Sequence, residues 1–484
     1  MPSNINSLSP RSFWLAIITS ALCGLAASLA MAPLFYWPFM IIGLGGLYLA
    51  QKNCTKAWHA FLCGWVFGFA YFIISLRWIG NALLVEGNEY AWAYPLAISG
   101  LPAMLAFFPA IACYFTKKLA PEKIIHNLLL FIILLSTTEW LRGFVFTGFP
   151  WNLYGYSWGN QLAILQILSL IGVYGLTVIT IIWGALSGLL LAKGAKPTHK
   201  YLCLAFVFTT YTAIHVYGAN RLDKAPPVMA DKNLNIKLVQ PNIDQADKWK
   251  RDKIMDNYQR LLTLSAHNEE QDPEQANHLT TWIIWPETAI SFHQLDNPYT
   301  KSLLSDMLAN YPNDVYVIGG ALLKNKDNGT YANSIIVLDK NADIIGRYDK
   351  SHLVPFGEYI PFQQWIPIET ISGFSGFQAG NGITTLNLPH EKKISPLICY
   401  EILFPGSVVQ EHNRPDFIVN VTNDAWYGKS AGPEQHLLKA RFRAIEENIP
   451  VIRVANTGYS ALIDGYGRFI LKTELFEELV KEYK

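Results

Sequence analysis

The sequence has 484 residues, of which 51% are hydrophobic and only 15% are charged, against roughly 25% charged residues in a typical soluble protein. The formal net charge is +1. A charge balance this close to neutral gives no indication of a nucleic-acid or acidic partner. Apolar residues concentrate between Phe13 and Val216. We therefore expect a multi-helix transmembrane domain over residues 1–220 and a globular domain over residues 221–484.

Seven segments of the first half are apolar enough to be candidates for membrane-spanning helices, which need about 20 residues. They lie near 13–33, 35–51, 60–80, 91–116, 124–146, 161–191 and 200–217. Their polar connections differ in charge. One set, which includes the N-terminal tail, carries Arg11, Lys52, Lys56, Lys117, Lys118, Lys123, Lys193, Lys196 and Lys200, and the alternate set carries little besides Arg77 and Arg142.

Lys and Arg accumulate on the cytoplasmic side of a membrane, so this alternation predicts a cytoplasmic N-terminus. Seven crossings then place the globular half outside the cytoplasm. A cleaved signal peptide is the alternative for the first segment, but the six later segments and the charge alternation favour a retained helix.

Short runs rich in apolar and β-branched residues predict strands in the globular half. These are "NIKLVQ", "TTWIIWPE", "VYVIGGALL", "SIIVLD", "ISPLIC", "FIVNVTN" and "PVIRVAN". Helical patterns fit about 247–267, 299–310 and 434–447. The Asn-Gly pair in "KDNGTY" predicts a hairpin, and "DGYG" near Asp464 predicts another turn. Strands alternating with helices indicate a layered α/β domain.

Cys399 is the only one of the six cysteines that lies in the polar half. The other five lie in or beside the apolar segments and are expected to be packing residues: Cys23, Cys54, Cys63, Cys113 and Cys203. A single cysteine in an oxidising compartment cannot form an internal disulfide, and its thiol is exposed to oxidation. Cys399 is therefore either buried and inert or retained for its reactivity.

Three polar residues fall at or just after predicted strands, where ligand sites of α/β folds collect. They are Glu287, Lys350 and Cys399. A cysteine nucleophile needs a base for its proton, and acyl transfer needs positive charge where the oxyanion forms. Glu287 as base, Lys350 as the cation and Cys399 as the acyl carrier would meet these needs. Each residue alone also has an ordinary interpretation, as a capping carboxylate, a solvated lysine or a buried strand-end residue.

The sequence motifs around these residues resemble those of a known family. "WIIWPETAI", "GRYDKSHLVPFGEYIP" and "PLICYEILFP" are similar to motifs of the nitrilase superfamily, with its Glu-Lys-Cys triad. "NDAWYGKSAGPEQHLLKARFRAIE" and the membrane motif "LRGFVFTGFPWNLYGYS" look like the apolipoprotein N-acyltransferase branch. The resemblance implies an αββα nitrilase-like sandwich on the periplasmic side of a bacterial inner membrane, carried by a multi-pass membrane domain.

The family's activity implies transfer of an acyl chain from a phospholipid to the α-amino group of the lipidated N-terminal cysteine of a diacylated apolipoprotein, through a cysteine thioester. By motif match the triad is Glu287, Lys350 and Cys399. The match also assigns supporting roles to Glu358, Trp249, Tyr400 and Glu401 and pocket-lining roles to Asn333 and Trp426. No metal or phosphate-binding motif appears, so we expect no cofactor. We further expect a monomer in which His352 and His436 are structural.

Residues 353–377, just after the predicted Lys350, contain five Phe and Trp side chains and several isoleucines. The Phe and Trp residues are Phe356, Phe362, Trp365, Phe374 and Phe377, and the glycines Gly373, Gly376, Gly380 and Gly382 suggest mobility. Two interpretations explain this density of apolar side chains equally well. One is an acyl-chain groove or lid at the membrane, and the other is an ordinary patch of the core.

Two other functions stay open at this point. One is a membrane-tethered nitrilase-like amidohydrolase, and the other is a non-enzymatic anchor for a binding domain. The sequence also departs from the family pattern, because the family usually carries a last membrane helix and the printed sequence ends in the polar stretch "LKTELFEELVKEYK". From this departure we expect an effect on stability or membrane docking rather than on the chemistry.

Overall fold

This computed structural model describes residues 10–86, 88–119, 124–192, 195–226, 233–266, 280–325, 329–361 and 376–483. The chain divides into two compact units. One unit consists of Met1–Gly80 and Trp92–Lys224, and the other of Asn81–Ala91 and Ala225–Lys484.

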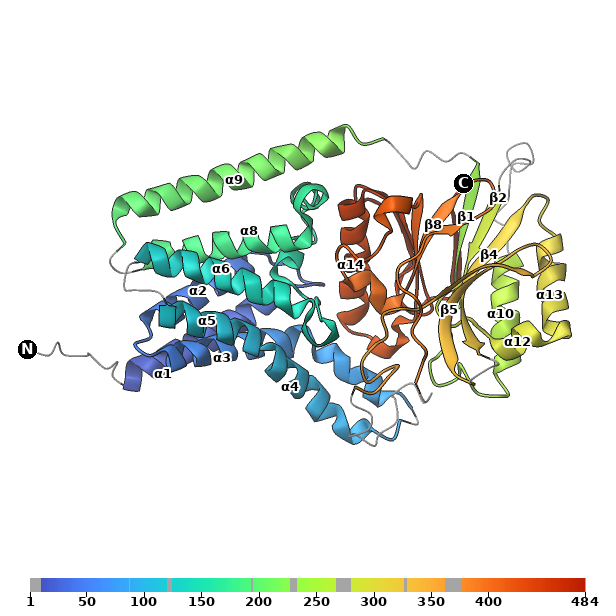
Figure 1. Cartoon of the computed structure of the whole chain (residues 1–484), viewed down its shortest axis with the longest axis horizontal. Helices are drawn as coiled ribbons and strands as arrows, with labels where there is room; N and C mark the ends of the chain where they lie inside the picture. The colour runs from blue at the N-terminus through green and yellow to red at the C-terminus, as the bar shows by residue number, and fades with distance from the viewer. Residues whose placement is uncertain are drawn as a thin grey trace, which may run out of the picture. The chain divides into compact units, whose positions relative to one another are not determined.

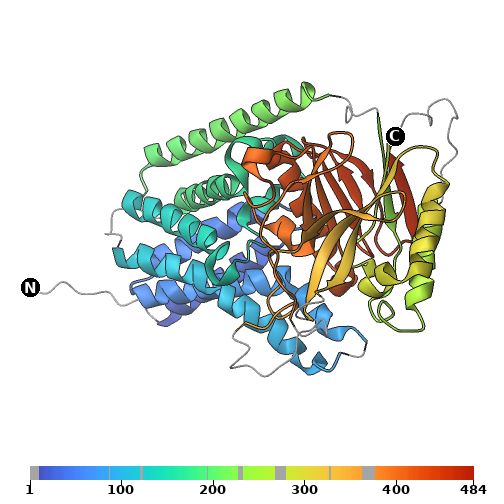
Figure 2. The same cartoon turned by 45° about the vertical axis from the view of Figure 1, so that its right-hand side comes forward.

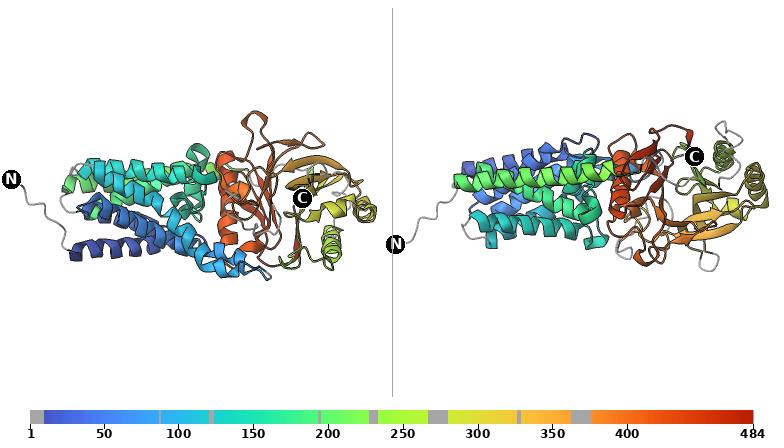
Figure 3. Two further views of the ribbon diagram at one scale, coloured as in Figure 1. Left: turned by 60° about the horizontal axis from the view of Figure 1, so that its bottom comes forward. Right: turned by 90° about the horizontal axis from the view of Figure 1, so that it is seen from above.

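The first unit is helical (Figure 1). Its helices are α1 (Pro10–Ser28), α2 (Pro38–Asn53), α3 (Ala57–Ser75), α4 (Tyr94–Leu105), α5 (Phe107–Leu119), α6 (Ile124–Arg142), α7 (Leu162–Leu165), α8 (Leu168–Leu191) and α9 (Pro197–Asp223). Helix α3 packs against α1 and α5, and α2 packs against α8. Several of these helices run alongside one another in both views of Figure 3.

Each of the seven predicted segments contains a helix, and five helices in the described part of the chain are long and apolar enough to cross a membrane. These five are Ala57–Ser75, Ala91–Leu119, Ile124–Arg142, Leu168–Leu191 and Pro197–Asp223. The second of them comprises α4 and α5. The helix at Pro38–Asn53 and the described part of the first, Ser12–Ser28, are shorter than the predicted spans. The predicted span 161–191 is interrupted, because Gly172 has a φ of 61° and only α7 precedes α8.

A buried ion pair organises the membrane motif "LRGFVFTGFPWNLYGYS". The Arg142 guanidinium lies 2.9 Å from the Glu139 carboxylate, one turn away on α6. Arg142 also donates to the carbonyls of Phe149 and Trp151, at 2.7 and 2.8 Å. Charged side chains are costly in an apolar interior unless they are paired in this way, so the pair fixes the loop that follows α6.

The second unit contains two β-sheets that face each other (Figure 2). One sheet has the order β13-β1-β2-β4-β5-β6, with β3 beside β4, and the other has the order β12-β11-β10-β9-β8-β7. The first sheet contains β1 (Leu234–Gln240), β2 (Thr280–Ile284), β3 (Ile290–Ser291), β4 (Val315–Lys324), β5 (Tyr331–Leu338), β6 (Ile344–Asp349) and β13 (Leu479–Tyr483). The second contains β7 (Leu386–Asn387), β8 (Lys393–Ile398), β9 (Phe417–Thr422), β10 (Val451–Ala455), β11 (Ala461–Ile463) and β12 (Phe469–Lys472).

Helices cover the outer faces of the sheets (Figure 1). Helices α10 (Ile254–Ala266), α12 (Phe292–Asp296) and α13 (Pro298–Ala309) lie on the side of the first sheet, and α14 (Gly432–Glu447) lies on the side of the second. Neighbouring strand residues point to opposite faces. Leu238 and Ile284 accordingly pack between the sheets, whereas Val239 and Ile283 pack beneath α10 and α13. The unit is therefore the predicted αββα sandwich.

Most predicted elements of this unit are confirmed. Each of the seven predicted strand segments contains a strand, and β4 pairs antiparallel with β5 across the predicted hairpin. The predicted helix over 247–267 begins later, at Ile254, because residues before it form turns. The polar stretch "LKTELFEELVKEYK" contains β13, which pairs antiparallel with β1. Within it, the buried Glu482 carboxylate lies 2.9 Å from the Lys237 ammonium.

Candidate active site

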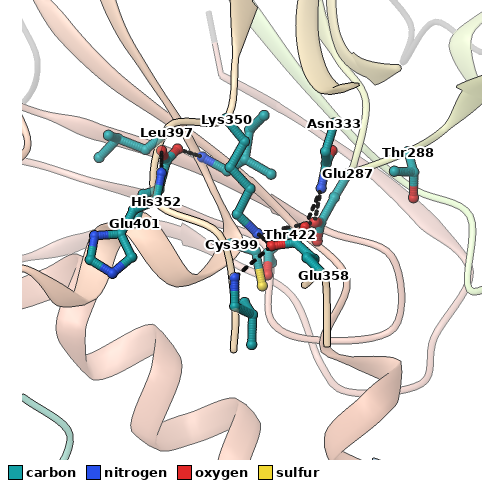
Figure 4. A network of polar contacts seen from close by, with 12 residues as sticks. Glu287, Thr288, Asn333, Lys350, His352, Glu358, Leu397, Cys399, Glu401 and Thr422 are labelled. Atoms are coloured by element: carbon teal, nitrogen blue, oxygen red, sulfur yellow. Dashed lines mark hydrogen bonds and ion pairs between the residues drawn. The ribbon is translucent and has the colours of Figure 1, made fainter. Parts of the chain in front are cut away.

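The three predicted triad residues lie at the ends of strands from both sheets (Figure 4). Glu287 follows β2, Lys350 follows β6 directly, and Cys399 follows β8 directly. The structure brings Glu287 and Lys350 together, with 4.0 Å between Oε1 and Nζ. All three residues are buried, with Lys350 only 1% exposed and Cys399 8% exposed.

Glu358 and Asn333 complete a buried polar cluster around Lys350. The Glu358 carboxylate lies 2.8 Å from Lys350 Nζ. Asn333, on β5, donates from one amide nitrogen to Glu287 Oε1 at 2.8 Å and to Glu358 Oε1 at 3.0 Å. Val354 N donates to the other Glu358 oxygen at 2.8 Å. The cluster therefore holds two carboxylates on either side of one ammonium.

Burial and neighbouring charges shift the pKa values of these groups in different directions. Burial raises the pKa of the Glu287 carboxyl, although Lys350 opposes the shift. Burial alone would lower the pKa of the Lys350 ammonium, but Glu358 and Glu287 outweigh it and raise that pKa. Burial and the Glu287 charge raise the pKa of the Cys399 thiol to about 12, with Lys350 acting against them. The resting thiol is therefore protonated near neutral pH, and a base must take its proton when it reacts.

Cys399 sits at a sharp turn between β8 and the 3₁₀ helix η5 (Cys399–Leu403). Its φ is +50°, a left-handed conformation that is uncommon for a residue with a side chain. Unusual backbone conformations persist where the surroundings over-determine them, which happens most often at functional sites.

Glu401 fixes this turn against the segment that follows Lys350. Glu401 Oε2 accepts from Ile398 N at 2.8 Å. Its Oε1 accepts from Tyr348 OH at 2.7 Å, Ser351 N at 2.8 Å, Ser351 Oγ at 3.0 Å and His352 N at 3.1 Å. Tyr400 is also buried, and its ring packs against Phe404 at 5.2 Å and His352 at 5.7 Å between centroids.

The two predicted tryptophans lie in different surroundings. Trp249 lines a cavity of about 20 Å³ together with Lys248, Glu287 and Thr288, so it is next to the predicted base. Trp426 is half-buried on η7 (Asp424–Tyr427) and takes no part in the contacts of Figure 4.

Lys248 is a neighbour of the site that the sequence analysis missed. Its buried Nζ donates to Glu287 O at 2.9 Å and to Thr288 Oγ1 at 2.6 Å. Burial lowers the pKa of Lys248 to about 8, although Glu287 acts in the opposite direction. Thr288 has a φ of +48°, so Lys248 holds a strained turn that carries the predicted base. The only signal in the sequence was its position beside Trp249.

The structure describes part of the aromatic segment 353–377. Phe356 is 46% exposed and Phe377 is half-buried, and Phe377 N donates to Glu358 O at 3.1 Å. Phe362, Trp365 and Phe374 lie outside the described residues. In the part of the chain that the structure describes, no group of three or more His, Cys, Asp or Glu side chains is placed to hold a metal ion.

This arrangement provides the groups that acyl transfer requires. A thiol lies beside a carboxylate with a raised pKa and beside an ammonium that remains charged. The carboxylate can accept a proton, and the ammonium can stabilise a developing oxyanion.

Two family models match the chain. The model described as "Apolipoprotein N-acyltransferase N-terminal domain" matches residues 23–186, and the model described as "Carbon-nitrogen hydrolase" matches residues 236–481. Among solved structures, a CN-hydrolase superfamily protein of Xanthomonas campestris is 21% identical and covers 52% of this chain and 89% of its own, with a TM-score of 0.37.

Curated relatives cover nearly the whole chain. The apolipoprotein N-acyltransferase of Rhodopseudomonas palustris is 35% identical over 96% of this chain and 88% of its own length. The protein of the same name from Rhizobium rhizogenes is 38% identical over 87% and 79%, and the one from Rickettsia prowazekii is 36% identical over 95% and 90%. With these relatives and both family models, the chain belongs to the apolipoprotein N-acyltransferase family, whose globular half is a carbon-nitrogen hydrolase domain.

Proposed function

We propose that this protein transfers a fatty acyl chain from a membrane phospholipid to the α-amino group of the lipidated N-terminal cysteine of an apolipoprotein. The observation that carries the proposal is the buried cluster of Glu287, Lys350 and Glu358 beside the Cys399 thiol. The names of the relatives support lipoprotein N-acylation, and the apolar helices of the same chain support lipid substrates.

In the first half-reaction, Cys399 Sγ attacks the ester carbonyl of the phospholipid while Glu287 takes the thiol proton. The oxyanion forms beside the Lys350 ammonium, which stabilises it. The ester C–O bond then breaks, and the lysophospholipid alcohol leaves with the proton held by Glu287. The acyl chain remains on Cys399 as a thioester.

In the second half-reaction, the α-amino group of the acceptor attacks the thioester carbonyl. Glu287 accepts a proton from the attacking nitrogen and returns it to Sγ as the C–S bond breaks. The products are the N-acylated acceptor and the free thiol, so the protein returns to its starting state.

The remaining residues support this chemistry in different ways. Glu358 and Asn333 keep the ammonium and the base in place through the contacts described above. Trp249, Tyr400 and Trp426 are proposed to bound the space for the substrates. Phe356 is exposed next to the cluster and is suited to contact an acyl chain.

We also propose an arrangement in the cell. Residues 1–220 span the inner membrane, with seven crossings, and residues 221–484 form a periplasmic catalytic domain. The protein acts as a monomer without a cofactor.

The test uses the full chain in detergent, a phospholipid with an isotope-labelled acyl chain, and a synthetic peptide that begins with a diacylglyceryl-cysteine. The expected product is a peptide heavier by one labelled acyl group on its α-nitrogen, and a Cys399→Ala variant should give none. Release of labelled free fatty acid without acylated peptide would overturn the proposal in favour of a hydrolase. Acylated peptide from the Cys399→Ala variant would overturn the assigned nucleophile.

A further inference from the structure

A second buried polar network lies directly behind the proposed nucleophile and has no part in the two half-reactions. Its members are His436 on α14, Asp424 on η7 and Arg453 on β10. Each of the three side chains is at most 1% exposed. Buried polar groups are costly unless their partners are well placed, which raises the question of what this network does.

His436 contacts the backbone of Cys399 through one ring nitrogen. Its Nε2 lies 3.1 Å from the carbonyl oxygen of Cys399, and its Nδ1 lies 2.8 Å from Asp424 Oδ1. A carbonyl oxygen can only accept a hydrogen bond. The contact is therefore a hydrogen bond when the ring proton is on Nε2, and Nδ1 then accepts from the Arg453 guanidinium, which lies 3.1 Å away.

The other members of the network hold the imidazole in one orientation. Arg453 donates to Asp424 Oδ2 at 2.8 Å, and the Thr422 hydroxyl donates to Asp424 Oδ1 at 3.0 Å. Burial alone would raise the pKa of the Asp424 carboxyl, but Arg453 and His436 outweigh it and lower that pKa to about 2. The carboxylate is thus ionised and fixed, and the Tyr427 ring packs edge-on against His436 at 5.7 Å.

The contact matters because of the conformation of Cys399. With a φ of +50°, the residue occupies the left-handed region only if its flanking peptide groups are held. Glu401 accepts from the backbone N–H of Ile398, the residue before Cys399, at 2.8 Å. His436 binds the following carbonyl, that of Cys399 itself. The two side chains thus fix the turn from both ends and thereby set the direction of Sγ.

We propose that His436 is a positioning residue of the acyl-transfer site: by donating from Nε2 to the Cys399 carbonyl, it holds the left-handed turn that presents the thiol to Glu287 and Lys350. The proposal rests on Cys399 being the nucleophile of the proposed function. It gives Asp424 and Arg453 the role of holding the imidazole.

Two variants of nearly the same length separate the hydrogen bond from packing. His436→Gln places an amide N–H close to the position of Nε2, whereas His436→Met fills a similar volume without a donor. The first readout is the rate at which iodoacetamide alkylates Cys399 in the full chain at a fixed pH, followed by the mass of the peptide that contains Cys399. This readout needs no phospholipid, so it remains informative if the proposed function fails.

The second readout is single-turnover acylation by phospholipid, with the rate measured at several phospholipid concentrations. A displaced nucleophile loses about a hundredfold in rate. We therefore expect His436→Met to lower the maximal acylation rate by about that factor. The phospholipid concentration that gives half the maximal rate should change little. The alkylation rate of Cys399 should change as well. His436→Gln should stay within about tenfold of the original protein in both rates.

Two results would overturn the proposal. One is a His436→Met variant that acylates and alkylates as the original protein does. The other is a His436→Gln variant that is as impaired as His436→Met, because the donor would then be irrelevant. If His436→Met loses its cooperative thermal transition, the His436→Gln variant decides alone: rates near those of the original protein support the proposal, and a hundredfold loss refutes it.

Discussion

Replacing Glu401 by Gln tests whether the turn at Cys399 is set by hydrogen bonds to a carboxylate. One carboxylate oxygen accepts four hydrogen bonds and the other accepts one, from Ile398 N. A glutamine amide has one oxygen and one NH₂ group. Its oxygen is expected to serve the four donors, which leaves the NH₂ group facing the N–H of Ile398.

The magnitude follows from the contact that is lost. A hydrogen bond to a charged acceptor contributes about 1.5–3 kcal/mol, and an unsatisfied buried polar group costs about 1–3 kcal/mol. The variant should therefore lose about 3–5 kcal/mol of stability. For a domain of this size each kcal/mol lowers the melting temperature by about 2–4 °C, so we expect a decrease of roughly 10 °C.

The assay combines thermal melting of the full chain in detergent with single-turnover acylation by phospholipid. Acylation should fall about a hundredfold, because the nucleophile moves relative to Lys350. The matched control is Glu477→Gln, a glutamate exposed on the surface, which should change neither value. A Glu401→Gln variant that melts and acylates as the original protein does would refute the reasoning.

Three further predictions concern the base, its support and the last strand. Burial raises the pKa of Glu287, so the acylation rate should fall, as pH decreases, through a value above the ordinary glutamate pKa of about 4.3. In Gly320→Ala, the added Cβ would clash with Thr288 N and lie 2.5 Å from Glu287 Cα, and acylation should drop at least about tenfold. Glu482→Gln leaves the buried Lys237 ammonium without its charged partner, which should cost about 3–5 kcal/mol and lower the melting temperature without slowing acylation below that temperature.

Each of these predictions has a result that contradicts it. If the acylation rate fell only at a pH at or below the ordinary glutamate pKa, the expected effect of burial on the pKa of Glu287 would be contradicted. Unchanged acylation in Gly320→Ala would mean that the backbone of the base tolerates displacement. A Glu482→Gln variant with an unaltered melting temperature would show that the terminal strand does not depend on the buried pair.

The strands could be predicted because their pattern is local. "NIKLVQ" and "FIVNVTN" carry β-branched and apolar residues in runs of strand length. Their alternation with helical patterns predicted a layered α/β domain, and the resemblance to the nitrilase superfamily implied the αββα arrangement. The placement of Glu287, Lys350 and Cys399 at strand ends was also accessible, since each follows directly or closely on such a run.

Glu358 and Asn333 were matched from the family motifs, but two other partners of these residues, Lys248 and His436, could not be predicted, because they come from distant parts of the chain. Lys248 reaches the Glu287 backbone from 39 positions away, and His436 reaches Cys399 from 37. Glu401 was matched to the family motif, but its contacts with the segment after Lys350 depend on how β6 and β8 end. Helix limits were the least accurate part, as the start of α10 and the interruption at Gly172 show.

The central claim is that Cys399 carries the acyl group, and the mass of the protein after incubation with phospholipid alone tests it directly. We expect one added acyl group on the peptide containing Cys399, released by hydroxylamine as a thioester should be and absent from Cys399→Ala. An adduct that persists in Cys399→Ala, or N-acylated peptide formed by a protein that never carries an adduct, would contradict the role of Cys399 as the acyl carrier.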